Sequence, residues 1–119
     1  MNNRFLFLDI DGVLNTHMIY REPIEGRRMI EKDGFYFELC WPSDKRVSNE
    51  FAVNWLSKLC LEYNLDIVIT STWLIGHSVE EIATCLYNSG LHKDVKVIDG
   101  CTTNQFKCRG VQIESWFDR

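Results

Sequence analysis

The chain has 119 residues and a formal net charge of −4. A chain of this length buries one hydrophobic core but not two, so a single domain over residues 1–119 is expected. Hydrophobic residues make up 45% of the sequence and charged residues 25%, which excludes a disordered or fibrous protein. The acidic balance argues against a broadly basic surface for a long nucleic-acid backbone, but not against a local positive pocket for one terminal phosphate.

The cysteines and the N-terminal segment indicate the compartment. Five cysteines are scattered without a CxxC pair and are expected to be reduced, mostly buried thiols. The three histidines stand at no spacing that would complete a zinc site with them. The apolar run after Arg4 is interrupted at Asp9, too early for a signal peptide or a membrane span. The sequence therefore predicts a cytoplasmic protein without a membrane partner.

Three apolar runs predict buried strands. The first covers residues 5–8 and is closed by Asp-Ile-Asp-Gly. The second covers residues 66–70, is rich in β-branched residues and leads into Thr70-Ser71-Thr72. The third covers residues 94–98.

Three other segments predict helices. Residues 48–63 follow Ser48, the expected N-cap, and carry apolar residues at helical spacing: Ala52, Trp55, Leu56, Leu59, Cys60 and Tyr63. Ser78-Val-Glu-Glu81 is a capping box that begins a second helix, which Gly90 ends. Apolar spacing over about residues 107–117 predicts a third helix.

Strands that alternate with helices predict a Rossmann-like α/β fold. Its parallel sheet carries helices on both faces and binds ligands at the carboxyl ends of its strands. Residues 17–46 interrupt the alternation with two prolines, two glycines and the aromatic run Phe35-Tyr36-Phe37. This segment is expected to form an inserted β-hairpin flap over the site.

Asp9 and Asp11 carry the strongest chemical signal. Two residues apart at a strand end, they project toward one side and reach a common centre about the size of a phosphate. Hydrolysis of a phosphate ester needs a nucleophile, a proton donor for the leaving oxygen and positive charge against the phosphoryl oxygens. Asp9 is the candidate nucleophile and forms an aspartyl-phosphate, while Asp11 is the candidate general acid and base. Gly12 lets the backbone turn beside the phosphate, and the two carboxylates are candidate ligands for Mg²⁺.

The segment Asp-Ile-Asp-Gly also permits two plainer interpretations. A polar turn after a core strand is the first. An EF-hand loop is the second, but Gly12 stands at the fourth loop position rather than the sixth, and Tyr20 takes the place of the bidentate Glu. The apolar run before the pair favours catalysis or metal binding over a plain turn.

The motifs resemble those of the haloacid-dehalogenase-like (HAD) superfamily of phosphohydrolases. Asp9-Ile-Asp-Gly-Val-Leu-Asn15 looks like motif I, whose first Asp is the nucleophile and whose second is the acid/base. Ile67-Val-Ile-Thr-Ser-Thr-Trp73 is similar to motif II, a strand ending in a Ser or Thr that holds the phosphate. The resemblance implies Ser71 for this role, with Thr70 and Thr72 as competing neighbours. The Ser-x-Trp spacing and the Asn after Val-Leu resemble the compact HAD domains of RNA-repair and polynucleotide-phosphatase proteins.

Motif III of the superfamily is a Lys or Arg near the start of a later helix, where its charge steadies the aspartyl-phosphate. Lys107 and Arg109 both match this description. The Arg-Gly-x-x-Ile pattern resembles that of the branch and favours Arg109. For either residue, a solvated surface charge is the alternative.

Motif IV follows in family members on a further strand, which supplies acids to the Mg²⁺ site. No such strand is expected here: Asp99 precedes the motif III candidates and Asp118 falls on the last helix. The expected consequences are a weaker metal site and an unpaired sheet edge beside the first strand. Such an edge invites formation of a homodimer.

The composition of the flap permits two roles. Its basic residues stand near aromatic residues, which superficially resembles a platform for stacking bases. Four acidic residues in the same stretch cancel the charge, so packing of the aromatics and exclusion of water is the favoured role.

Two hypotheses of different class follow. The first is a Mg²⁺-dependent phosphohydrolase that acts on a phosphorylated small molecule, a nucleotide or a polynucleotide end. The second is a truncated HAD-like module that binds phosphate or regulates a partner without turnover. A fragment of a longer enzyme, whose remaining strand is missing, is a third reading.

Overall fold

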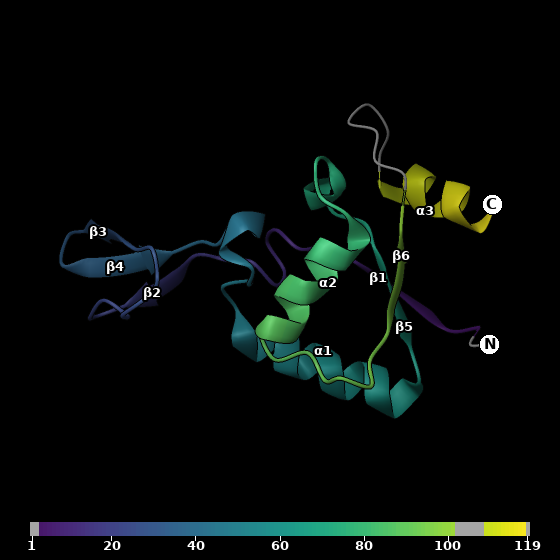
Figure 1. Cartoon of the computed structure of the whole chain (residues 1–119), viewed down its shortest axis with the longest axis horizontal. Coiled ribbons are helices and arrows are strands. Elements are labelled where there is room, and N and C mark those ends of the chain that lie inside the picture. Colours follow the sequence, from purple (N-terminus) through teal and green to yellow (C-terminus); the bar gives the residue numbers. More distant parts are fainter. Residues whose placement is uncertain (1–2, 102–108, 119) are drawn as a thin grey trace.

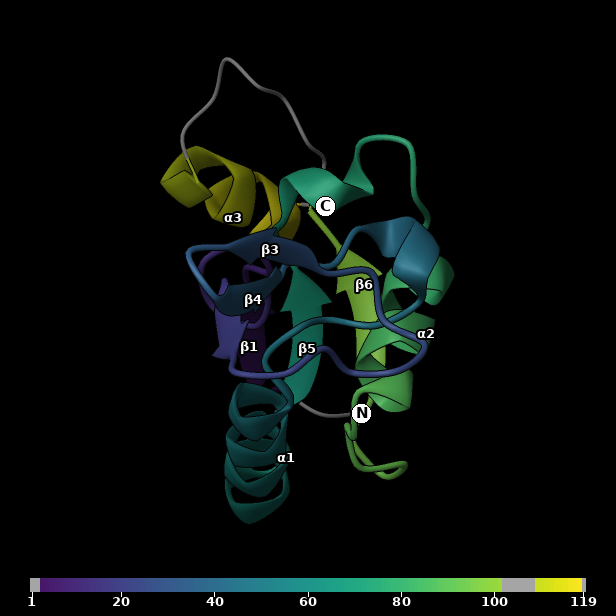
Figure 2. The same ribbon diagram turned by 90° about the vertical axis from the view of Figure 1, so that its left-hand side faces the viewer.

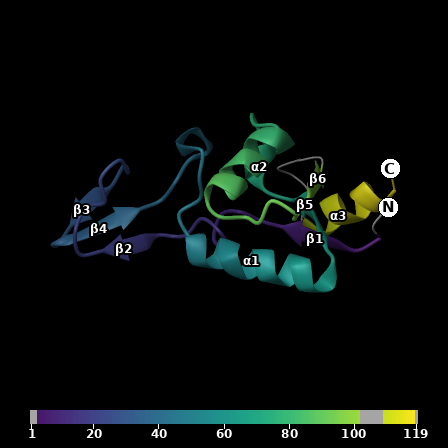
Figure 3. The ribbon, with the colours of Figure 1, turned by 60° about the horizontal axis from the view of Figure 1, so that its bottom comes forward.

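The computed structural model describes residues 3–101 and 109–118, and its dimensions are 49 × 34 × 19 Å (Figure 1). In chain order, its elements are β1 (Phe5–Leu8), β2 (Met18–Tyr20), β3 (Ile30–Lys32), β4 (Phe35–Glu38), the short 3-10 helix η1 (Pro42–Asp44), α1 (Glu50–Tyr63), β5 (Asp66–Ile69), the 3-10 helix η2 (Thr72–Leu74), α2 (Val79–Asn88), β6 (Val97–Gly100) and α3 (Arg109–Phe117). The sheet of β2, β3 and β4 lies at one end of the long axis and α3 at the other (Figure 3).

The body of the molecule is built on a parallel sheet with the strand order β1-β5-β6 (Figure 2). Residues of α1 and α2 share one buried core with Leu8, Ile67 and Ile69 of the sheet. Because side chains alternate along a strand, Phe5 and Phe7 face the other side of β1. Helix α3 lies on that side. The predicted Rossmann-like sheet with helices on both faces is confirmed.

Helix α3 is fastened to β1 by aromatic contacts. The ring of Trp116 packs edge-on against Phe5 and Phe7, with centroid distances of 5.0 and 5.5 Å. Phe117 packs at 5.4 Å from Phe7. Within the described part of the chain, β1 is the outermost strand of its sheet. Dimerisation at this edge stays a prediction.

The third strand lies further along the chain than the sequence predicts. The prediction covers residues 94–98, whereas β6 begins at Val97 and ends at Gly100. The amide of Val95 donates to the carbonyl of His92 at 3.0 Å and closes a turn, in which Val95 is buried. The apolar run that predicts a strand therefore begins in a turn that faces the core. As a consequence, Asp99 lies inside β6, paired with Val68 of β5.

The N-cap of α1 is Asn49 rather than Ser48. The Asn49 side chain accepts a hydrogen bond from the amide of Ala52 at 3.1 Å. The Ser48 hydroxyl is used elsewhere, because it accepts from the amide of Thr16 at 2.9 Å and donates to the Thr16 carbonyl. The prediction was wrong because a bond to a residue 32 positions away competes with the local cap.

The apolar face expected on α1 is partly wrong. The buried residues of this helix are Val53, Leu56, Ser57 and Cys60. Trp55 is 71% exposed, and the ammonium of Lys58 lies 5.1 Å from its ring centroid. Only one face of α1 lies against the sheet. The apolar stripe is wider than that face, so its outer part is exposed to solvent.

The flap is a three-stranded antiparallel sheet with the order β2-β4-β3. The predicted hairpin is present as β3 and β4, and its turn residues Asp33 and Gly34 have φ angles of 54° and 82°, as a type I′ turn requires. Strand β2 is the third strand of this sheet and pairs with β4, with Met18 opposite Glu38. The sheet extends away from the body (Figure 1).

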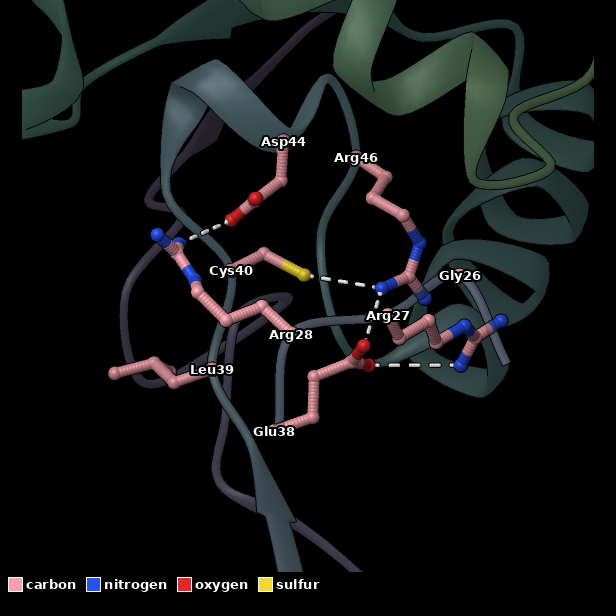
Figure 4. A pocket seen from close by; sticks show the side chains of 8 residues that line it. All are labelled: Gly26, Arg27, Arg28, Glu38, Leu39, Cys40, Asp44 and Arg46. Atoms are coloured by element: carbon pink, nitrogen blue, oxygen red, sulfur yellow. Dashed lines mark hydrogen bonds and ion pairs between the residues drawn. The ribbon is translucent and has the colours of Figure 1, made fainter. Parts of the chain in front are cut away.

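A cluster of charges fastens the flap to the start of α1, and Figure 4 shows its flap side, with Glu38 between Arg27 and Arg46. The carboxylate of Glu38 is 2% exposed and lies 2.9 Å from Arg46 and 3.5 Å from Arg27. Both arginines also contact Glu50, at 3.0 Å from Arg27 and 2.9 Å from Arg46. Burial acts to lower the pKa of Arg46, but its hydrogen bonds to Glu38 and Glu50 outweigh this effect and raise the pKa.

Four of the five cysteines match the expectation of buried thiols, and Cys108 lies outside the described residues. Cys40, Cys60, Cys85 and Cys101 are all buried. Burial raises the pKa of the Cys40 thiol to about 11, although Arg46 beside it acts in the opposite direction. Cys40 is therefore a neutral thiol at pH 7. None of the described helices is both long enough and apolar enough to span a membrane.

Candidate active site

The loop after β1 places Asp9 and Asp11 at the carboxyl edge of the sheet. The carbonyl of Ile10 accepts from the amides of Leu14 and Asn15, both at 2.9 Å, and the amide of Gly12 donates to the carbonyl of Asn15 at 3.0 Å. Gly12 has a φ of 81°, which L side chains rarely adopt, so glycine suits this tight turn. The loop thus folds back on itself directly after the strand.

Asp9 stands beside a cation from the last helix. Its Oδ1 accepts from the amide of Ile10 at 2.8 Å, and its Oδ2 lies 3.7 Å from Nη2 of Arg109. Arg109 is itself held by Gln112, at 3.1 Å. The side chains of both Asp9 and Arg109 are partly exposed, so the pair remains accessible from solvent. Lys107, the other candidate for motif III, lies outside the described residues.

Asp11 is held by two side-chain donors. The indole Nε1 of Trp73 donates to its Oδ1 at 3.1 Å, and Nδ2 of Asn15 donates to the same oxygen at 3.2 Å. In the sequence, Trp73 and Asn15 stand out only as points of family resemblance. Their contacts with Asp11 were missed. The contact between Asn15 and Asp11 could have been found from the sequence, because the two residues are four positions apart in one tight turn.

The three hydroxyl residues after β5 differ in exposure. The Ser71 side chain is buried, and its Oγ accepts from the amide of Trp73 at 3.1 Å. Thr70 is also buried, and its amide donates to the carbonyl of Leu8 at 2.8 Å, which ties the strand end to β1. Thr72 is exposed. Ser71 therefore caps η2 in this structure, and phosphate binding by Ser71 or Thr72 stays a prediction.

Asp99 makes hydrogen bonds that hold the structure together. Its Oδ2 accepts from the indole of Trp116 at 2.9 Å, and its Oδ1 accepts from the amide of Gly100 at 2.8 Å. It thereby joins β6 to α3. Asp118 follows the end of α3 and is exposed. Among the described residues, no group of three or more His, Cys, Asp or Glu side chains is placed to hold a metal ion.

Two cavities lie between Asp11 and the flap. A cavity of about 440 Å³ borders Asp11 and Gly12, and its full lining is Asp11, Gly12, Asn15, Thr16, His17, Leu39 and Trp41. A second cavity of about 270 Å³ is lined by His17, Arg28, Ile30, Phe37, Leu39 and Trp41. His17, Leu39 and Trp41 line both cavities, so the two lie next to each other, and together they are called the groove. The base of the flap therefore borders the candidate site.

The model of one protein family matches almost the whole chain. It describes the HAD domain in Swiss Army Knife RNA repair proteins and matches residues 5–119. The chain belongs to this family. The match bears out both the resemblance to the HAD superfamily and the narrower resemblance to the compact RNA-repair type. No curated protein and no solved structure gave a significant match.

Membership relates the geometry to the type of chemistry. HAD domains include hydrolases and phosphatases, and this HAD domain carries its two motif I carboxylates on a tight loop at the sheet edge. A cation from α3 and donors from the segment after β5 converge on the same loop. The arrangement has the charged groups that phosphoryl transfer needs.

Proposed function

We propose that this HAD domain is a Mg²⁺-dependent phosphohydrolase that acts on phosphate monoesters through an aspartyl-phosphate on Asp9. The observation that carries the proposal is the approach of Arg109 to within 3.7 Å of Asp9, on the loop that also presents Asp11. A nucleophile, an acid and a positive charge are thus available at one edge of the sheet.

The reaction proceeds in two steps. In the first, a carboxylate oxygen of Asp9 forms a bond to phosphorus while the bond from phosphorus to the leaving oxygen breaks, and Asp11 gives its proton to that oxygen. In the second, Asp11 takes a proton from water, the water oxygen bonds to phosphorus, and the bond from Asp9 to phosphorus breaks. Inorganic phosphate leaves, Asp9 is again a free carboxylate and Asp11 again carries its proton. Arg109 offsets the negative charge of the phosphoryl group throughout.

The donor set suits a magnesium ion. The Asp9 carboxylate and oxygens of Asp11 are hard ligands of the kind that Mg²⁺ prefers, and water and substrate phosphate complete such sites. When bound, Mg²⁺ supplies further positive charge to the phosphoryl oxygens. Since the described residues offer no third acidic ligand, we expect weak binding of the ion.

The groove supports a nucleotide or polynucleotide end as substrate. Trp41 is 55% exposed and lines both cavities that lead away from Asp11. An exposed indole face offers a surface on which a base stacks. Arg28 and His17 lie along the same groove and offer donors to a neighbouring phosphate. The relatives described by the family model are RNA repair proteins, which is consistent with this substrate.

An assay of phosphate release tests the proposal. The intact chain is incubated with 4-nitrophenyl phosphate and with an oligonucleotide that carries a terminal phosphate, in Mg²⁺ and in excess EDTA. We expect release that depends on Mg²⁺ and is lost in EDTA. Binding of the oligonucleotide without release of phosphate from either substrate would favour the alternative, a HAD-like module that binds phosphate without turnover.

Trp41→Ala is expected to weaken binding of the oligonucleotide selectively. Stacking of one base contributes about 1–3 kcal/mol, so KM for the oligonucleotide should rise by roughly five- to a hundredfold. The KM for glycerol phosphate, which has no ring to stack, should change by less than about twofold. Trp55→Ala is the matched control, because Trp55 is an even more exposed tryptophan on α1, outside the lining of the groove. Equal effects on both substrates would contradict a stacking role.

A further inference from the structure

Asn15 uses the whole hydrogen-bonding capacity of its side chain. Its Oδ1 accepts from the amides of Cys40 and Ser48, both at 3.2 Å. Its Nδ2 donates to the carbonyl of Cys40 at 2.7 Å and to Oδ1 of Asp11 at 3.2 Å. A primary amide has two lone pairs and two N–H donors, so all four are satisfied. The residue is 2% exposed, and its side chain is therefore held in one place.

The partners of Asn15 also fix which way its amide points. Backbone N–H groups donate only, so the atom that faces Cys40 N and Ser48 N must be the oxygen. The nitrogen must then face the Cys40 carbonyl and the Asp11 carboxylate. Rotation of the amide by half a turn would set like groups against each other at all four contacts. The donor to Asp11 is consequently unambiguous.

Trp73 supplies the second donor from a different part of the fold. It lies in η2, after β5, and is 6% exposed with its ring in the main core. Its own amide donates to Ser71 Oγ at 3.1 Å. An indole N–H donates and never accepts, so this contact with Asp11 has only one polarity. Two rigid donors from separate segments thus meet at one carboxylate oxygen.

We propose that Asn15 and Trp73 are positioning residues that fix the orientation of the Asp11 carboxyl group, the candidate general acid. This inference rests on the proposed phosphohydrolase function. Two N–H groups point at Oδ1 and hold this oxygen in place as an acceptor. Oδ2 accepts no hydrogen bond from the described residues. Asp11 lines the groove, so donors that fix Oδ1 also set the direction in which the rest of the carboxyl group meets a leaving oxygen there.

The same network links Asp11 to the flap. Cys40, which follows β4, binds Asn15 through both its amide and its carbonyl. Ser48, which precedes α1, binds the same side chain. The orientation of the Asp11 carboxylate and the position of the flap base therefore depend on one amide group.

Trp73→Phe tests the proposal because it removes the donor and keeps most of the apolar ring. The readout is kcat/KM for a series of phosphate esters, since this constant covers the steps through departure of the leaving group. A good leaving group such as 4-nitrophenolate needs little protonation, whereas an alkoxide needs a well-placed proton. We expect a loss of roughly ten- to a hundredfold for alkyl phosphates but less than about threefold for 4-nitrophenyl phosphate. A loss of equal size for all esters, or no loss, would overturn the proposal.

Two further proteins complete the experiment. Trp116→Phe is the matched control, because it also removes an indole donor to a carboxylate, that of Asp99, and any loss should be uniform across esters. Benzothienylalanine at position 73 replaces the N–H by sulfur at nearly equal volume, so it gives the same comparison if Trp73→Phe fails to fold. A wild-type chain without phosphatase activity would refute the proposed function itself, whereas uniform losses in an active enzyme refute only the positioning role.

Discussion

Replacement of Asp9 by Asn should reduce kcat by at least about a thousandfold and leave the fold intact. The amide has nearly the shape of the carboxylate, and its oxygen still accepts from the amide of Ile10, which contacts Asp9 at 2.8 Å. The variant lacks the negative charge and the nucleophilic oxygen. It should therefore bind substrate but form no covalent intermediate.

Acid-quenched labelling measures this loss directly. Wild-type protein incubated with a ³²P-labelled phosphate ester should retain acid-stable, base-labile label on the chain, and Asp9→Asn should retain none. Asp99→Asn is the matched control, because Asp99 contacts Trp116 and Gly100 rather than the motif I loop. Its turnover should stay within about threefold of wild type. Equal label on Asp9→Asn and wild type would place the nucleophile elsewhere.

Arg46→Met should lower the free energy of unfolding by about 3–5 kcal/mol. Glu38 is 2% exposed and lies 2.9 Å from Arg46, so the substitution leaves a buried carboxylate with only the longer contact to Arg27, at 3.5 Å. Desolvation of an underpaired charge outweighs the gain from an apolar side chain. The contacts of Arg46 with Glu50 and with Cys40 Sγ are lost as well.

Urea unfolding of the variant gives the magnitude, and a neighbouring ion pair outside the cluster provides a control. Arg28 pairs with Asp44 at 2.8 Å, but its side chain is 57% exposed. Arg28→Met should therefore cost less than about 1 kcal/mol, because solvent screens that pair. Hydrogen exchange should also speed up in the flap strands of Arg46→Met. Similar losses from both substitutions would show that burial of Glu38 does not govern the strength of the cluster.

Several features of this protein follow from short stretches of sequence. The apolar run before Asp9 predicts β1, and the Asp-Ile-Asp-Gly that follows predicts the turn that carries Asp9 and Asp11. Both depend only on residues close together in the sequence. The capping box of α2 forms as predicted, with Ser78 and Glu81 each bonded to the backbone of the other. The pKa of Glu81 is lowered mainly by the hydrogen bond from the backbone of Ser78, and further by bonds from the side chains of His77 and Ser78. The Asp33-Gly34 turn likewise follows from the local preference for positive φ.

The candidate catalytic groups meet their partners only in the tertiary structure. Arg109 lies 100 positions from Asp9, and the family resemblance rather than any local pattern predicted it as the cation of the site. Trp73 lies 62 positions from Asp11, and its contact with Asp11 was missed because no local periodicity reports such a pair. Asn49 rather than Ser48 is the N-cap of α1 because Ser48 is bonded to a distant segment. Strand β6 begins only at Val97 because the residues before it form a turn against the core. Trp55 is exposed because the other face of α1 meets the sheet. Local bonding and periodicity therefore determined the elements and the loop that carries the carboxylates. Contacts that form only when distant segments pack determined which charges and donors surround them.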